Sequence, residues 1–259
     1  MSRSPISTLS FSVAAALLSL AGASQAAPSP LTHHGFSSAG SANVNVGPTN
    51  QGGNVAASAG AFNVTWGGAT FFTYCVELTQ YARLNQTHPY EQVDALAYFS
   101  SNYLPLLAAD ASTVVDRLGR LFSATNGVQL PTGGTLGSWT YSAAQASAAM
   151  QLAVWEIVYE GQTGSDSFDG LSLAGGAFKE NTVNGTAANI RNLSNSFLAS
   201  AAAVTDVQFD ISVLRSAANQ DYLMATRLPR RNNDVPLPGT LALAGLGLAA
   251  LVVLRRRGA

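Results

Sequence analysis

Residues 61–78 read Ala61-Phe-Asn-Val-Thr-Trp-Gly-Gly-Ala-Thr-Phe-Phe-Thr-Tyr-Cys-Val-Glu-Leu78, and this stretch indicates that the protein contains a β-sheet. Phe62, Val64 and Trp66 alternate with other residues, which indicates a strand with one buried face. Gly67-Gly68 supplies a tight turn, and the aromatic and β-branched residues that follow predict a returning strand. The sequence therefore predicts a β-hairpin, with Cys75 in the middle of its second, buried strand.

The segment before this hairpin, residues 31–60, is rich in Gly, Ser, Ala and Asn. We expect loops there, with one weak strand at 42–46. His33-His34 lies in the segment, but cysteine and acidic partners are not nearby in the sequence, so a metal site is not expected.

Beyond the hairpin the hydrophobic period changes to that of helices. The helices that we expect cover 90–103, the residues after Asp110, 146–159 and 187–203. Ser142 and Gln145 form a capping box for the third of them, and Gly161 ends it.

The rest of the body is expected to be loop and strand. Loops are expected around Gly133-Gly134 and over 162–185, and strand alternation returns at 207–214 and 222–226. Strands, then helices, then strands predict an α+β fold, a β-sandwich or barrel-like sheet with a helical insertion.

The N-terminus has the layout of a secretory signal. Arg3 precedes an apolar stretch at 11–21, and small residues follow it. The stretch is too short to span a bilayer comfortably, and we place the signal-peptidase cut between Ala26 and Ala27.

The C-terminus carries an apolar segment of near-membrane length. Residues 236–254 are rich in Leu, Ala, Gly and Val, and about 20 apolar residues suffice for a helix to cross a bilayer. Arg255, Arg256 and Arg257 follow, which places that end in the cytoplasm and the body outside.

This tail resembles the PEP-CTERM sorting signal of Gram-negative bacteria, which combines a Val-Pro-Glu-Pro-like motif, an apolar helix and an arginine cluster. Here the motif is Val235, Pro236, Leu237 and Pro238, with Leu237 in place of glutamate. The resemblance implies an exosortase-type processing enzyme as a partner. It also implies a cell-envelope or extracellular location, with anchoring in the inner membrane.

The expected organisation has four parts. They are a signal peptide at 1–26, a Gly/Ser/Asn-rich segment at 27–60, a body at 61–229, and a sorting tail at 230–259 with a transmembrane helix at 237–254. The residues from Ala27 to Pro229 include seven basic and thirteen acidic side chains, a formal charge of −6. A nucleic-acid partner is therefore not expected, because no basic stripe remains to bind phosphates.

Cys75 is the only cysteine of the chain, so it has no internal disulfide partner. Gln151 shares an apolar helical stripe with Ala148 and Trp155, where a carboxamide needs hydrogen-bonding partners. It either bonds to strand backbone as a structural glutamine or has its carbonyl carbon bonded elsewhere. A cysteine thiolate that attacked this carbonyl would expel ammonia and leave an internal thioester.

The two motifs Tyr74-Cys75-Val76 and Met150-Gln151-Leu-Ala-Val-Trp155 resemble the paired motifs of bacterial thioester domains. The resemblance implies a Cys75–Gln151 crosslink, with Tyr74 and Trp155 as shielding neighbours. It also implies covalent attachment to an extracellular polysaccharide or a neighbouring surface protein. Gln80 and Gln145 are rival partners for the thiol.

Two other readings of the sequence stay open. In a non-reactive structural protein of an extracellular matrix or biofilm, Cys75 and Gln151 would simply pack the core. A secreted hydrolase is the weakest reading, because no Gly-x-Ser-x-Gly or His-Glu-x-x-His motif occurs and the histidines are only His33, His34 and His88. We therefore expect no enzyme and no cofactor.

Overall fold

The computed structural model describes residues 27–47, 53–101, 110–160, 168–182 and 185–229. Its strands are β1 (Ser29–Gly47), β2 (Val55–Trp66), β3 (Ala69–Thr73), β4 (Thr87–Asp94), β5 (Gly134–Leu136), β6 (Trp139–Tyr141), β7 (Lys179–Glu180), β8 (Phe209–Arg215) and β9 (Tyr222–Arg227). Its helices are α1 (Ala95–Ser100), α2 (Ala111–Thr125), α3 (Ala143–Tyr159) and α4 (Gly185–Ala202).

The main sheet is antiparallel and curls into a nearly closed barrel. Its strand order is β3-β2-β1-β4-β8-β9, and β7 pairs with one end of β1. Just after β3, Cys75 forms an isolated antiparallel bridge with Tyr222 of β9, so the two edge strands meet. Closure of a sheet in this way removes its exposed edges. The prediction of an α+β fold with a barrel-like sheet is confirmed.

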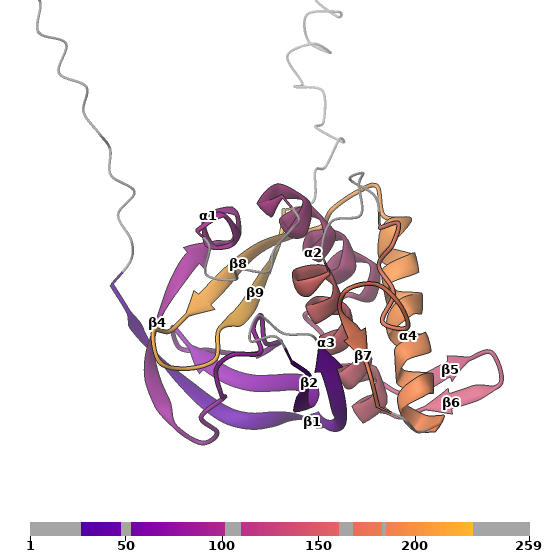
Figure 1. The fold of residues 1–259 in the computed structure, drawn as a ribbon. Coiled ribbons are helices and arrows are strands. Elements are labelled where there is room, and N and C mark those ends of the chain that lie inside the picture. Colours follow the sequence, from indigo (N-terminus) through magenta and orange to yellow (C-terminus); the bar gives the residue numbers. More distant parts are fainter. Residues whose placement is uncertain (1–26, 48–52, 102–109, 161–167, 183–184, 230–259) are drawn as a thin grey trace, which may run out of the picture.

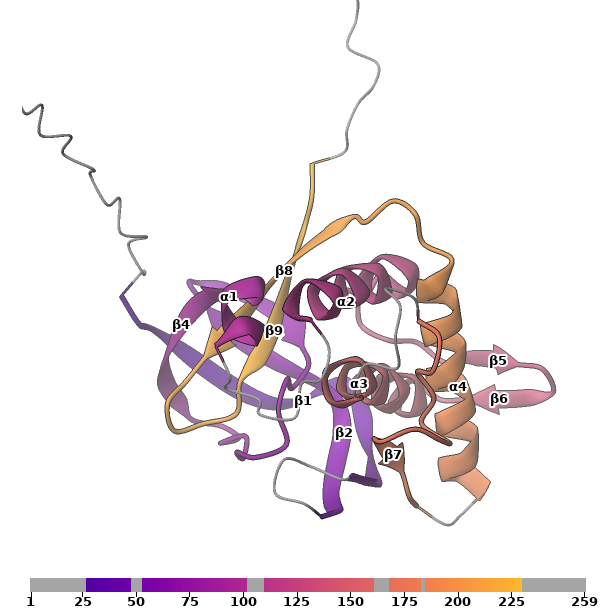
Figure 2. The ribbon, with the colours of Figure 1, turned by 45° about the horizontal axis from the view of Figure 1, so that its top comes forward.

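The helices α2, α3 and α4 gather on one side of the barrel, and the short α1 lies over β4 and β8 (Figure 1, Figure 2). The helix α3 is the central one, since every residue from Ala146 to Tyr159 is buried. A helix that is apolar on all sides is expected inside a protein rather than on its surface. It packs between the strands β1 and β2 and the helices α2 and α4. Its expected capping box, Ser142 with Gln145, is present.

The predicted hairpin is formed by β2 and β3. Gly67 and Gly68 have φ values of 58° and 80°, the left-handed conformation that a two-residue turn of this kind requires. The strand β3 ends at Thr73, however, so Cys75 lies at the barrel seam and not in the middle of a regular strand.

The expectation of loops before residue 60 is wrong. The strand β1 runs over 19 residues and pairs with β2, across the boundary drawn at residue 60. Its register shifts twice, between His33 and Phe36 and between Phe36 and Ser41. Gly35 and Gly40 lie at these shifts with φ of 96° and 88°, which is the bulge geometry that glycine permits. Because β1 has many small residues and two bulges, its sequence lacks the alternation of apolar and polar residues that predicts a strand.

Three further segments differ from expectation. The loop expected over 162–185 contains the short strand β7. The helix expected over 90–103 begins only at Ala95, because residues 90–94 pair with β8 as part of β4. The glycine-rich loop expected before α3 contains the hairpin of β5 and β6, which projects from the helical side (Figure 1). The expected helices after Asp110 and at 187–203, and the last two strands, are present as α2, α4, β8 and β9.

Candidate functional site

The site lies at the seam where the barrel closes. The Val76 N–H donates to the Asp221 carbonyl at 3.0 Å, and the Leu223 N–H donates to the Tyr74 carbonyl at 2.9 Å. These two bonds bracket Cys75, which faces Tyr222 without a backbone hydrogen bond to it. The N–H and carbonyl of Cys75 therefore point away from β9, toward α3.

Gln151 of α3 occupies this open side of the strand. The Cys75 N–H donates to Gln151 Oε1 at 2.8 Å, and Gln151 Nε2 donates to the Cys75 carbonyl at 2.9 Å. One carboxamide thus binds both backbone groups of one residue, as a neighbouring strand would. The structure brings together the two residues that the sequence paired, although the chain separates them by 76 positions.

The two hydrogen bonds fix the orientation of the carboxamide on the backbone of Cys75. A strand side chain stands roughly perpendicular to the plane of its backbone hydrogen bonds, so the Cys75 side chain lies outside the plane of these two bonds. The Cys75 N–H already donates to the carbonyl oxygen, where negative charge would develop during attack. Gln151 has no exposed surface and Cys75 is 5% exposed, so both groups are shielded from water.

The thiol itself is held in its neutral form. Burial raises the pKa of Cys75 well above its ordinary value, and the negative charges of Glu77 and Asp221 raise it further. A thiolate at this position therefore forms only transiently near neutral pH.

Two buried carboxyl groups lie beside the seam, and sequence reasoning did not single them out. Asp221 precedes Tyr222, and its carboxylate accepts from the Tyr98 hydroxyl at 2.8 Å and from the Ser216 N–H at 2.7 Å. Burial raises the pKa of Asp221 to about 7, against the effect of the Ser216 bond. Burial also raises the pKa of Glu77, which accepts a hydrogen bond from Thr79. Glu77 is two residues after Cys75, and that spacing was the one available signal for it.

The proposed shielding residues are both buried, in different places. Tyr74 has no exposed surface, and its ring packs edge-on against Phe122 of α2 at 6.1 Å between centroids. Because neighbouring strand residues point to opposite faces, Tyr74 lies across the strand from the Cys75 side chain. Trp155 is 2% exposed and lies one helical turn beyond Gln151 on α3.

Neither rival glutamine is hydrogen-bonded to Cys75 within the described ranges. Gln145 Oε1 accepts from the Ser142 N–H at 2.7 Å in the capping box of α3. Gln80 lies beyond the seam in the segment after Val76, and no hydrogen bond joins it to Cys75 in the described part of the chain.

The histidines do not form a metal centre in the described ranges, which contain no group of three or more metal-ligating side chains. His33 is buried against Phe62 and Tyr222, and burial lowers its pKa to about 4. The Gly35 N–H donates to its Nδ1 at 2.9 Å. The neutral ring therefore belongs to the aromatic packing of the barrel.

The C-terminal end of α3 is fixed by two buried carboxyl groups. Glu160 accepts from the N–H groups of Ala177 and Phe178 at 2.9 and 2.7 Å, and Glu156 accepts from the Ser172 N–H. These bonds hold the segment after residue 168 against the helix that carries Gln151, so they restrict the helix position on which the Cys75–Gln151 contact depends.

Comparison with known protein families decides the nature of the C-terminal tail. Residues 234–257 match the PEP-CTERM protein-sorting motif. The chain is an exported, surface-sorted protein. The PEP-CTERM motif implies processing by an exosortase and membrane-associated sorting at the cell envelope.

Comparison with solved structures finds the N-terminal domain of the Streptococcus pyogenes pilus tip adhesin Cpa. It aligns over 66% of this chain and 85% of its own length, with a TM-score of 0.40 and 12% sequence identity. No curated protein sequence is detectably similar to this chain.

Several predictions from the sequence concern the two ends, outside the described residues. They are the signal peptide with Ala26, the sorting residues from Val235 to Arg257, and the transmembrane helix at 237–254. Within the described ranges, none of the helices has the length and apolar character needed to cross a membrane.

Proposed function

We propose that this exported protein attaches covalently to a nucleophile outside the cell through an internal thioester between Cys75 and Gln151. The observation that carries the proposal is the two-point hydrogen bond that fixes the Gln151 carboxamide on the backbone of the one cysteine. A reactive pair gains most when its atoms are held in place before reaction, in a site that excludes water.

The first step would convert the two side chains into a thioester, which is an activated acyl group. The Cys75 sulfur attacks Gln151 Cδ, the Sγ–Cδ bond forms, the Cδ–Nε2 bond breaks, and ammonia leaves with the thiol proton. The Cys75 N–H stabilises the charge on Oε1 during this step. Loss of Nε2 also frees the Cys75 carbonyl from its present partner.

The second step would transfer the acyl group. An amine or hydroxyl of the target attacks Cδ, the new Cδ–N or Cδ–O bond forms, and the Sγ–Cδ bond breaks. The proton of the nucleophile then returns to the sulfur. Lys179 is the only lysine of the chain, so the protein carries few amines that would compete with the target.

The second candidate is a non-reactive structural protein of the matrix. The same hydrogen bonds favour it, because Gln151 satisfies two backbone groups of Cys75 that the barrel seam leaves open. In that case the thiol is an inert core group and the sorted body has a mechanical role.

Intact-mass measurement on the full chain, purified in detergent and with its ends assigned by peptide mapping, separates the two. The thioester predicts a mass lower by one ammonia, a thiol that resists alkylation after unfolding, and incorporation of methylamine. Cys75→Ala and Gln151→Ala should each restore the full mass and abolish methylamine incorporation. Gln80→Ala and Gln145→Ala are matched controls that should keep the ammonia loss. A wild-type chain of full mass with a freely alkylated thiol would leave only the structural role.

A further inference from the structure

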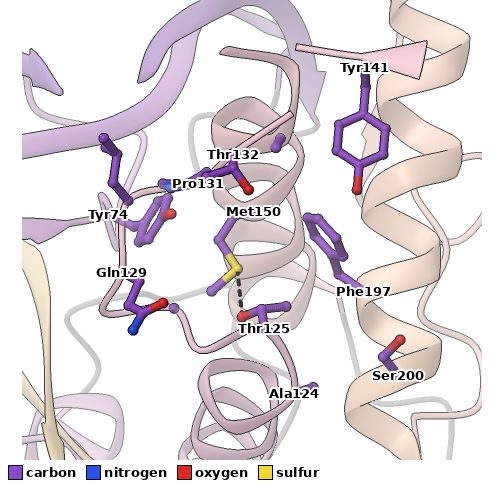
Figure 3. A pocket seen from close by; sticks show the side chains of 13 residues that line it. Tyr74, Ala124, Thr125, Gln129, Pro131, Thr132, Tyr141, Met150, Phe197 and Ser200 are labelled. Atoms are coloured by element: carbon purple, nitrogen blue, oxygen red, sulfur yellow. Dashed lines mark hydrogen bonds between the residues drawn. The ribbon is translucent and has the colours of Figure 1, made fainter. Parts of the chain in front are cut away.

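A pocket lies directly beside the seam, on the face of the strand opposite the Cys75 side chain. Its volume is about 340 Å³, within the range of about 300–1,000 Å³ that is usual for small-molecule sites. It is enclosed by the turn after α2, by α3, by β6 and by α4 (Figure 3).

Two of its lining residues tie the pocket to the seam. Tyr74 and Met150 are the chain neighbours of Cys75 and Gln151, and both line the pocket. Met150 also accepts a hydrogen bond from the Thr125 hydroxyl, with 3.5 Å between Oγ1 and Sδ (Figure 3). A ligand held here is therefore next to the strand and the helix that carry the two site residues.

The Tyr74 hydroxyl is the observation that points to a ligand. Tyr74 has no exposed surface, and its hydroxyl has no hydrogen-bond partner among the described residues. A buried hydroxyl without a partner is costly, and native proteins leave few of them. Because the hydroxyl has no accessible surface, a ligand hydroxyl or carbonyl group would supply the partner once the pocket wall over Tyr74 opens.

The remaining lining indicates the chemistry of that ligand. The rings of Tyr141 and Phe197 stand on one side of the pocket, and Gln129 and Thr132 offer a carboxamide and a hydroxyl on the other (Figure 3). The lining contains no charged side chain, so a lysine ammonium or a carboxylate would enter without a counter-charge. A sugar ring has an apolar C–H face and a rim of hydroxyl groups, which matches rings on one side and neutral polar groups on the other.

We propose that this pocket binds one unit of a neutral polysaccharide. The inference deepens the proposed function, on which its biological meaning rests: the pocket would hold the polymer against the strand and the helix that carry Cys75 and Gln151. Binding itself is non-covalent and does not require the thioester.

Calorimetric titration of the full chain in detergent tests the proposal. The probes are cellohexaose, laminarihexaose, mannohexaose and N-acetylchitohexaose, with hexagalacturonate and hexalysine as charged controls. We expect at least one neutral hexasaccharide to bind and neither charged oligomer to bind. Absence of binding by all four neutral probes, or tighter binding of a charged one, would overturn the proposal.

Three variants locate the binding. Tyr74→Phe should weaken binding about fivefold by loss of one hydrogen bond, and Phe197→Ala about tenfold by loss of a ring. Tyr81→Phe removes a hydroxyl from a side chain that is 84% exposed and does not line the pocket, and should leave the affinity unchanged. In the absence of sugar, Tyr74→Phe should be at least as stable as wild type, because the hydroxyl that it removes has no partner. Wild-type affinity in Tyr74→Phe or in Phe197→Ala, or a loss of stability in sugar-free Tyr74→Phe, would contradict the assignment.

The mass of the same samples keeps the two proposals apart. A chain of full mass that binds sugar would contradict the thioester proposal and support the pocket proposal. A chain that lacks one ammonia and binds no sugar would contradict the pocket proposal and support the thioester proposal. Prior treatment with methylamine, which opens any thioester, should not change the affinity for sugar.

Discussion

The side-chain amide of Gln151 binds both the N–H and the carbonyl of Cys75, at 2.8 and 2.9 Å, and so takes the place of a strand at the seam of the barrel. The contact ties the central helix to the point where the sheet closes. It also holds a carboxamide on the backbone of the residue that carries the one thiol of the chain. A single contact thus serves both the closure of the fold and the proposed chemistry.

Gln151→Ala should destabilise the protein by about 3 kcal/mol. It leaves two buried backbone groups of Cys75 without partners and opens a cavity at the helix–sheet interface. Chemical denaturation measures the change. Gln145→Ala, which removes only half of an exposed capping box, should cost about 1 kcal/mol. Equal effects of the two variants would contradict a structural role for the seam contact.

The rate of ammonia loss should rise with pH. The reacting species is the thiolate, and the pKa of Cys75 is raised by burial and by the charges of Glu77 and Asp221. Asp221→Asn removes one of these charges, so it should lower the pKa of the thiol and accelerate the reaction severalfold above pH 7. The rate is followed by mass after refolding from denaturant. A rate independent of pH, or slower in Asp221→Asn despite a native fold, would mean that Asp221 acts in another way.

The sequence was sufficient for the elements with strong periodicity. The hairpin around Gly67-Gly68 and the capped helix α3 are present as expected, because turn glycines and a capping box act locally. The contact between Cys75 and Gln151 could be predicted because each is an unusual side chain in an apolar segment.

The parts that sequence reasoning missed depend on long-range contacts. The strand β1 is built from small residues and interrupted by bulges at Gly35 and Gly40. Its extended conformation is therefore determined by its pairing with β2 and not by local strand propensity. Asp221 is brought beside the seam only by the pairing of β9 with residues 74–76, two segments that are far apart in the sequence. The partnerless hydroxyl of Tyr74 is likewise a property of the packed structure.

Gly176→Ala should destabilise the protein by about 2 kcal/mol. Gly176 has φ of 84°, and a Cβ there would lie 2.7 Å from the Glu160 carboxylate that accepts from Ala177 and Phe178. The neighbouring Gly175→Ala is the matched control, because a Cβ there meets nothing within 4 Å and its φ lies outside the left-handed region. Its effect should be within about 0.5 kcal/mol of zero. If both variants were equally stable, the Glu160 anchor would not depend on the close approach of Gly176.

Glu156 should lower the stability of the protein as pH rises from 4.5 to about 8, and Asp221 should do the same between 3.8 and about 7. Burial raises the pKa of Glu156 from 4.5 to about 8, and the charge of Glu160 adds to the shift. Between these two pH values the folded carboxyl keeps its proton while the unfolded one loses it, so the folded state binds more protons and loses stability with increasing pH.

Glu156→Gln removes the contribution of Glu156 to this pH dependence, because a carboxamide does not titrate. The variant keeps an uncharged acceptor for the Ser172 N–H. The variant should be more stable than wild type by at least about 1 kcal/mol at pH 8 and equal to it near pH 4. Glu156→Ala removes the acceptor as well and should be the less stable of the two variants at every pH. Denaturation midpoints across this pH range measure all three proteins. Parallel profiles for wild type and Glu156→Gln would show that the carboxyl is already ionised in the folded state, and that the helix carrying Gln151 tolerates a buried charge one turn from its end.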